Sequence, residues 1–276
     1  ARHVDFVGSA SMEPRPLGRG NFDPNTGRWT PQGEAYLATL SNLTGVRRLR
    51  LLKGLWAMAE GMVYADAWDP AFNLVNRFDV PKEWRRVWAV DFGYSNPFCW
   101  QCWALDGDGR MYRIAEIYRT KRLVEDHARD ILAWQKANKE PDPEATVCDH
   151  DAEDRATLER HLGLRTIPAS KSVSDGLQAT AAMMREAGDG KRRLLLLRDS
   201  LVGTHTHPHA TRDALLDEKK LPACTEEEIE GYVWNEKQSQ GHALKDEPLK
   251  VNDHGCDAMR YAVMYVEHDA SEGIYF

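Results

Sequence analysis

The sequence lacks any apolar run approaching the roughly 18 residues that a membrane-spanning helix needs. Its N-terminus also lacks the apolar segment of a signal peptide. Its five cysteines are an odd number without regular spacing, which favours a reduced cytosolic protein over a disulfide-stabilised secreted one. The chain begins with Ala1 rather than Met, and we therefore expect an excised fragment or a processed product.

The sequence also lacks an excess of positive charge, with 36 Lys and Arg against 43 Asp and Glu. The formal net charge of −7 excludes a protein that binds nucleic acid with its whole surface, although a site built from carboxylates is itself acidic. Basic residues still gather locally at Arg47–Lys53 and Lys191–Arg193, where a solvated helix face and a DNA contact both remain open. No G-x-x-x-x-G-K-[ST] phosphate loop occurs, so the sequence predicts no ATPase of that type. Asp91-Phe-Gly93 matches a kinase motif, but its companion motifs are missing.

The chain nevertheless has enough apolar residues for a sizeable core, with 42% hydrophobic residues and nine tryptophans among 276 residues. Residues 1–35 are rich in turn-forming residues, and we expect an extended arm or the tail of a missing domain there. Pro31 to Leu43 has helical spacing that ends at Gly45. Residues 65–85 have the composition of a linker, and residues 199–250 are polar without a clear pattern.

Between these segments the pattern predicts a mixed α/β sheet with helices on both faces. Three strands come first and are antiparallel, with a hairpin turn at 106–109; strands and helices then alternate. The expected strands are 87–90, 98–105, 111–118, 145–148, 165–169 and 194–197, with an edge strand at 232–234. The expected helices are 123–137, 156–162, 173–187 and 252–267.

Three carboxylates stand at informative places in this pattern. Asp91 ends the first buried strand, Asp149 ends a later short strand, and Asp257 lies one turn into the last helix. Strand ends are where α/β sheets place their sites, and an aspartate inside an apolar helix face has poor helix propensity. Converging carboxylates are the usual ligands of Mg²⁺ or Mn²⁺. Two such ions about 3.5–4 Å apart can activate water and stabilise the leaving oxygen of a phosphodiester.

Several short motifs in a fixed order give the chain a resemblance to a known family. They are Leu52-Lys-Gly54-Leu-Trp56, Gly61-Met-Val-Tyr64, Val90-Asp-Phe-Gly93, Val147-Cys-Asp149, Asp151-Ala-Glu153, Pro168-Ala-Ser-Lys171, Asp175-Gly176, Asn252-Asp-His254 and Asp257-Ala-Met-Arg-Tyr261. From Gly45 to about Val266 the sequence resembles the C-terminal nuclease part of the large terminase subunit of tailed bacteriophages.

The resemblance implies an RNase H-like fold and a metal-dependent endonuclease that cuts concatemeric double-stranded viral DNA during genome packaging. It implies Asp91, Asp149 and Asp257 as the ligands of two Mg²⁺ or Mn²⁺ ions. Residues 1–80 would then be the remnant of the ATPase half and its connection, and residues 81–276 the nuclease domain. The implied partners are DNA, the portal protein, the small terminase subunit and the ATPase half, in the host cytoplasm and without a membrane.

Some assignments stay open at this level. Asp151 is an alternative to Asp149, which we favour because it directly ends the apolar run. Asp253 is a further ligand or the cap of the last helix. Lys171 is an auxiliary or DNA-contacting candidate or an ordinary surface residue, and His254 is such a candidate or a helix-start histidine that contacts the backbone. The sequence favours a polar loop over a zinc site for a group of three histidines, His205, His207 and His209.

Three other function classes compete with the terminase nuclease. One is another RNase H-like nuclease of the resolvase or transposase type, and one is an ATP-binding domain of the actin and sugar-kinase type. The latter needs a second glycine-rich phosphate turn, which the sequence lacks. The third is a non-catalytic module that docks on DNA or on the portal.

Overall fold

The computed structural model describes residues 22–23, 28–31, 61–235 and 247–272. The chain divides into two compact units, Ala1–Met62 and Val63–Phe276. In the first unit, β1 (Phe22–Asp23) pairs antiparallel with β2 (Arg28–Trp29), as the turn-forming residues between them favour. Apart from Pro31, the helix expected from Pro31 to Leu43 lies outside the described residues, and so do the basic residues 47–53.

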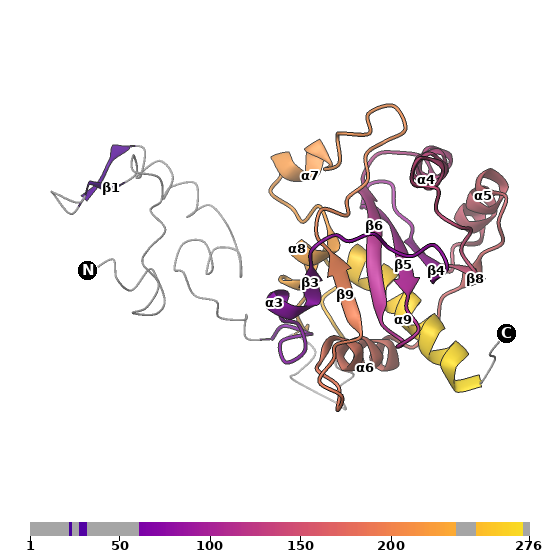
Figure 1. Cartoon of the computed structure of the whole chain (residues 1–276). Helices are drawn as coiled ribbons and strands as arrows, with labels where there is room; N and C mark the ends of the chain where they lie inside the picture. Colours follow the sequence, from indigo (N-terminus) through magenta and orange to yellow (C-terminus); the bar gives the residue numbers. More distant parts are fainter. Residues whose placement is uncertain (1–21, 24–27, 32–60, 236–246, 273–276) are drawn as a thin grey trace. The chain divides into compact units, whose positions relative to one another are not determined.

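The second unit is built on a seven-stranded mixed sheet with the strand order β3-β9-β6-β5-β4-β7-β8 (Figure 1). Its strands are β3 (Leu74–Val75), β4 (Arg85–Asp91), β5 (Phe98–Leu105), β6 (Met111–Arg119), β7 (Ala145–Cys148), β8 (Ile167–Pro168) and β9 (Leu194–Leu197). The consecutive strands β4, β5 and β6 are antiparallel, because short connections join them. The β4–β7, β7–β8, β6–β9 and β3–β9 pairs are parallel.

The central strands are buried on both faces, and alternate side chains enter two separate cores. Val87 and Ala89 of β4 face one core, whereas Trp88 and Val90 face the other. This alternation follows from the two-residue period of a strand. It fixes the register of β4, because a shift by one residue would exchange every side chain between the two cores.

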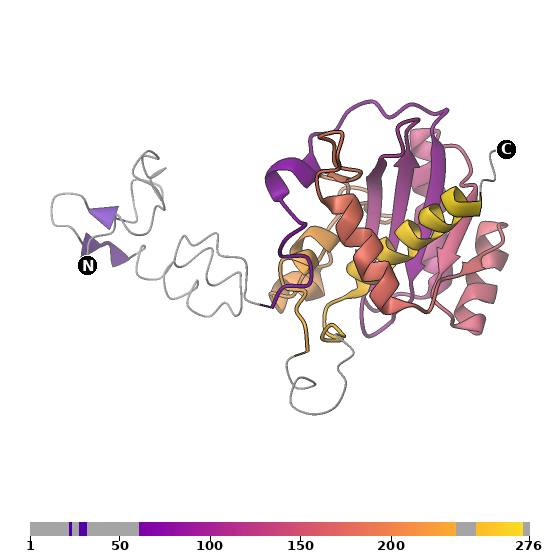
Figure 2. The ribbon, with the colours of Figure 1, turned by 90° about the horizontal axis from the view of Figure 1, so that it is seen from below.

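Helices cover both faces of the sheet, as the sequence predicts (Figure 2). On one face lie α6 (Val173–Met184) and α9 (His254–Glu272), with α9 crossing β4 and β5. On the other face lie α4 (Val124–Asn138) and α5 (Ala152–Leu162), which pack against each other. Three short helices complete the unit: α3 (Pro70–Asn73), α7 (Ala214–Glu218) and α8 (Thr225–Ile229). No helix in these described ranges is both long and apolar enough to cross a membrane.

The structure corrects several expected boundaries. The expected linker at 65–85 contributes α3, β3 and the start of β4, and the buried Asn73 side chain donates to the backbone oxygens of Met184 and Leu194. Sequence pattern missed these elements because each is too short to show a period.

Five further elements differ in extent. The expected strand 165–169 shortens to β8, and the strand at 232–234 reduces to an isolated bridge between Trp234 and Pro248. Helix α6 ends three residues early, at Met184. Helix α5 begins four residues earlier than expected, because Asp151 caps it, and α9 runs from His254 to Glu272.

Candidate active site

The ends of two adjacent parallel strands place Asp91 and Asp149 at the same edge of the sheet. Val90 of β4 is in register with Cys148 of β7, and each aspartate follows at the next position. The Asp149 N–H donates to the Val90 carbonyl oxygen over 3.1 Å, which continues the ladder by one residue. The two carboxylates therefore leave neighbouring strands together, as expected for a site at a sheet edge.

Helix α9 brings the third carboxylate, Asp257, to these strand ends. Burial raises the pKa of Asp91 to about 6, and the negative charges of Asp257 and Asp149 contribute to that rise. The same three carboxylates raise the pKa of Tyr261, after burial as the main cause. The structure thus brings together three aspartates that are up to 166 positions apart (257 − 91) along the chain.

Two side chains of α9 hold the Asp91 carboxylate. The His254 Nδ1 lies 2.9 Å from one carboxylate oxygen, and the Tyr261 hydroxyl donates to the other over 3.3 Å. Burial alone would lower the pKa of His254, but its hydrogen bond and ion pair with Asp91 raise it. His254 is therefore a direct partner of the candidate site and not an ordinary residue at the start of a helix.

Cations surround the Asp257 carboxylate. The Arg260 Nη2 lies 3.0 Å from one oxygen, and the Lys250 Nζ lies 3.3 Å from the other. The Lys250 Nζ is also 3.4 Å from Asp253 Oδ2, a buried oxygen that has no hydrogen-bond partner in the described part of the chain. Arg260 packs against Gly176 of α6, where a Cβ would lie only 2.6 Å from the arginine Cγ. A glycine at 176 thus lets α6 approach the arginine that pairs with Asp257.

The remaining candidate residues lie elsewhere or have other partners. Asp151 is exposed, and its Oδ1 accepts from the Glu153 and Asp154 N–H groups, both over 3.0 Å, as the cap of α5. Lys171 is exposed between β8 and α6, and within the described ranges it has no hydrogen bond or ion pair. His205 lies beside Asp130, with 2.6 Å from its Nδ1 to the carboxylate.

A buried polar network fixes the first turn of α9, and sequence reasoning missed it. Glu228 of α8 accepts from the N–H groups of Gly255 and Cys256 over 2.6 and 3.0 Å, and from the Tyr118 hydroxyl. Gln101 of β5 donates to the Gly255 carbonyl oxygen over 2.9 Å. The Glu228 contacts satisfy two backbone donors that a helix start otherwise leaves unpaired.

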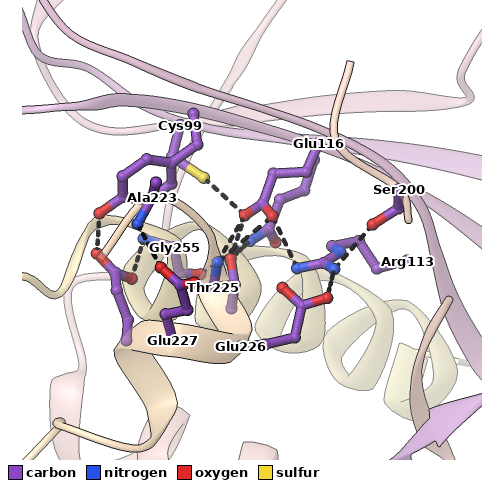
Figure 3. A network of polar contacts seen from close by, with 12 residues as sticks. Cys99, Arg113, Glu116, Ser200, Ala223, Thr225, Glu226, Glu227 and Gly255 are labelled. Atoms are coloured by element: carbon purple, nitrogen blue, oxygen red, sulfur yellow. Dashed lines mark hydrogen bonds and ion pairs between the residues drawn. The ribbon is translucent and has the colours of Figure 1, made fainter. Parts of the chain in front are cut away.

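The network continues into the sheet through Glu116 of β6 (Figure 3). Glu116 accepts from the Thr225 hydroxyl and forms an ion pair with Arg113, 2.9 Å from Nη1 to Oε2; Arg113 also pairs with Glu226. Burial raises the pKa of Glu116, while Arg113 opposes that rise. The run Glu226–Glu228 has the composition of a solvated helix, and only the fold shows that it lies under α9.

The chemistry of the donor set fits a hard divalent cation. Asp91, Asp149, Asp257 and Asp253 offer only oxygen ligands. The pKa of Asp91 is raised mainly by burial and further by the charges of Asp257 and Asp149, and a bound cation would relieve that repulsion. As they stand, however, no three His, Cys, Asp or Glu side chains of the described residues form a metal-binding group. Lys250 and Arg260 contact the two Asp257 oxygens.

No protein-family model matches the sequence, and no curated protein matches it. Among solved structures, the large terminase of a thermophilic bacteriophage is 24% identical with a TM-score of 0.57, over 86% of this chain and 52% of the other. The P22 large terminase nuclease domain is 16% identical with a TM-score of 0.52, over 76% of this chain and 95% of the other. The nuclease domain of the bacteriophage SPP1 large terminase, solved with bound Mn, is 16% identical with a TM-score of 0.43, over 70% and 96%.

The chain thus spans about half the length of the thermophilic-phage large terminase and nearly all of the P22 nuclease domain. At identities below 25%, structural similarity is evidence of a shared fold and not of a shared activity. The seven-stranded mixed sheet, with helices on both faces, confirms the α/β class expected from the sequence. The chain has the RNase H-like fold of the large terminase nuclease domains.

Proposed function

We propose that this protein is a metal-dependent endonuclease that cleaves double-stranded DNA, of the kind that cuts concatemeric viral DNA at packaging. The observation that carries the proposal is the meeting of Asp91, Asp149 and Asp257 at one edge of a terminase-like sheet. A buried carboxylate whose pKa is raised by two others is typical of a functional site.

In this proposal the three aspartates hold two Mg²⁺ or Mn²⁺ ions, with Asp253 as an outer oxygen donor. Such ions would lower the pKa of water and stabilise the departing 3′ oxygen of the phosphodiester. His254 and Tyr261 orient the Asp91 carboxylate through their hydrogen bonds. Lys250 neutralises Asp257 and Asp253 until the cation takes its place.

The wider setting is also a proposal. Residues 1–80 would be the remnant of the ATPase half and its connection, whose last part adds α3 and β3 to the second unit, and 81–276 would form the nuclease domain. The whole protein would work with the ATPase half, the portal protein and the small terminase subunit in the host cytoplasm. The thermophilic-phage structure supports this setting only in that the chain covers about half of that large terminase.

Removal of the metal tests the function directly. The protein incubated with supercoiled plasmid and Mn²⁺ should produce nicked and linear DNA, and the same reaction with EDTA should leave the plasmid intact. Agarose gels measure both products. Cleavage that persists in EDTA would exclude a metal-dependent mechanism.

The pairing of Asp257 with Lys250 and Arg260 also favours a second candidate, a non-catalytic module that docks on DNA or on the portal. An intact plasmid in Mn²⁺, together with measurable DNA binding, would support that module. A preference for four-way junctions over linear duplex would instead indicate a nuclease of the resolvase type.

The choice between Asp149 and Asp151 leads to a separate prediction. Asp151→Ala should cost about 1 kcal/mol of unfolding free energy, because it removes the cap of α5, and should keep plasmid cleavage near the wild-type rate. Asp149→Ala should have the opposite pattern, with stability retained and cleavage lost. Urea unfolding followed by fluorescence and a plasmid assay measure the two effects. If Asp151→Ala lost cleavage and Asp149→Ala kept it, Asp151 and not Asp149 would be the site residue.

A further inference from the structure

A cavity of about 280 Å³ lies beside the start of α9. Its walls come from the β4–β5 loop, the residues after β6, helix α7 and the segment before α9. Three lysines line it: Lys121, Lys219 and Lys250. Because these lysines come from three separate segments, the fold and not a local charge run brings them together.

Two of these lysines are available to a ligand. Lys121 Nζ lies 2.9 Å from the Ser95 hydroxyl and 5.2 Å from the centre of the Tyr94 ring, and Tyr94 is 53% exposed. Lys219 is exposed at the end of α7. Within the described ranges neither forms an ion pair with a carboxylate, so their charges are not neutralised by the protein.

The cavity shares a wall with the carboxylate site. Asp253 and His254 line it, and His254 Nδ1 lies 2.9 Å from Asp91. The third lysine, Lys250, lines the cavity and contacts Asp257 over 3.3 Å. A polyanion that enters the cavity therefore lies one side chain away from Asp91.

We propose that this cavity binds the phosphate backbone of duplex DNA next to the bond that is cut. The proposal rests on the proposed function, because it places the DNA relative to the aspartates. The volume of about 280 Å³ lies at the lower end of the range of about 300–1,000 Å³ that is typical of small-molecule pockets, and it has room for a backbone phosphate. With a net charge of −7, the protein needs such a local cationic site to hold DNA against its own field.

The test is the affinity for a fluorescent 20-base-pair duplex, measured by anisotropy in EDTA so that no cleavage occurs. The double variant Lys121→Gln/Lys219→Gln should bind at least about tenfold more weakly near 0.1 M salt. The slope of log affinity against log salt concentration should become shallower by about 2, one for each lost phosphate contact. Lys136→Gln/Lys139→Gln on α4 is the matched control; it changes the net charge equally, and Lys139, like Lys121, has a positive φ.

Each outcome decides the proposal. Weaker binding in the first variant but not in the control supports it, provided that the melting temperatures agree. Equal binding in both variants, or no binding by the wild type, overturns it. Plasmid cleavage with Mn²⁺ tests the proposed function separately. A wild type that cleaves while the Lys121/Lys219 variant binds normally would leave the function intact and remove only this site.

Discussion

Asp91→Asn should lose plasmid cleavage by at least about a thousandfold while the protein remains fully folded. Asp91 is close to both other carboxylates, since the charges of Asp257 and Asp149 add to the rise in its pKa that burial causes. Metal ions contribute several kcal/mol of transition-state stabilisation, and each 1.4 kcal/mol corresponds to a factor of about ten in rate. An amide at this position keeps the shape of the side chain but removes the charge that would hold the cation.

Stability should not fall, and this separates a site residue from a structural one. Burial raises the pKa of Asp91 to about 6, so at neutral pH the folded protein carries a carboxylate whose charge is unfavourable there. In pH terms, the folded state binds this proton more tightly than the unfolded state, and stability falls as the pH rises through about 6. Asparagine removes that cost, and the melting temperature of the variant at pH 8 should equal or exceed that of the wild type.

Asp79→Asn provides a matched control, because Asp79 is exposed and the same charge is removed. It should cleave at the wild-type rate. The measurements are initial rates of plasmid nicking in Mn²⁺ and melting curves by circular dichroism. Cleavage by Asp91→Asn within about tenfold of the wild type would contradict the assignment of Asp91, whatever its stability.

Those parts of the site that follow a local pattern could be predicted from the sequence. Asp91 and Asp149 each come after a short apolar run, and parallel strand ends meet at one edge. Asp257 stands out because an aspartate is unfavourable among the apolar residues of a helix. The class of fold follows similarly from three adjacent strands and the strand–helix alternation after them.

The partners of these carboxylates could not be predicted, since they depend on distances that no local pattern encodes. Lys250 belongs to a polar segment without periodicity, yet its ammonium group contacts both Asp253 and Asp257. Tyr261 reaches Asp91 only because α9 crosses β4. Residues 65–85 resemble a linker in composition, and only long-range pairing of β3 with β9 places part of them in the sheet.

Glu228→Ala should cause a large loss of stability, which sequence alone would not suggest for a residue in an acidic run. Glu228 is fully buried and accepts from two N–H groups of α9 and from the Tyr118 hydroxyl. Alanine leaves these three buried donors without an acceptor, at about 1–3 kcal/mol each. Since water can enter part of the space, we expect a loss of about 3–5 kcal/mol, or about 10 °C in melting temperature.

Glu228→Gln should instead remain close to the wild type at low pH and become the more stable protein at high pH. Burial raises the pKa of Glu228 from 4.5 to about 8, so the folded state keeps a proton that the unfolded state releases between these values. The stability that this proton contributes is therefore complete below about pH 4.5 and is lost as the pH rises through about 8. Glutamine resembles the protonated acid and has no proton to lose.

Melting temperatures of the wild type and of Glu228→Gln, measured from pH 5 to pH 9, test this directly. The difference between the two proteins should be small at pH 5 and should grow in favour of glutamine up to about pH 9. A difference that stays constant with pH would mean that Glu228 is ionised throughout. In that case its charge, and not a neutral hydrogen-bonded acid, would hold the start of α9 beneath the aspartates.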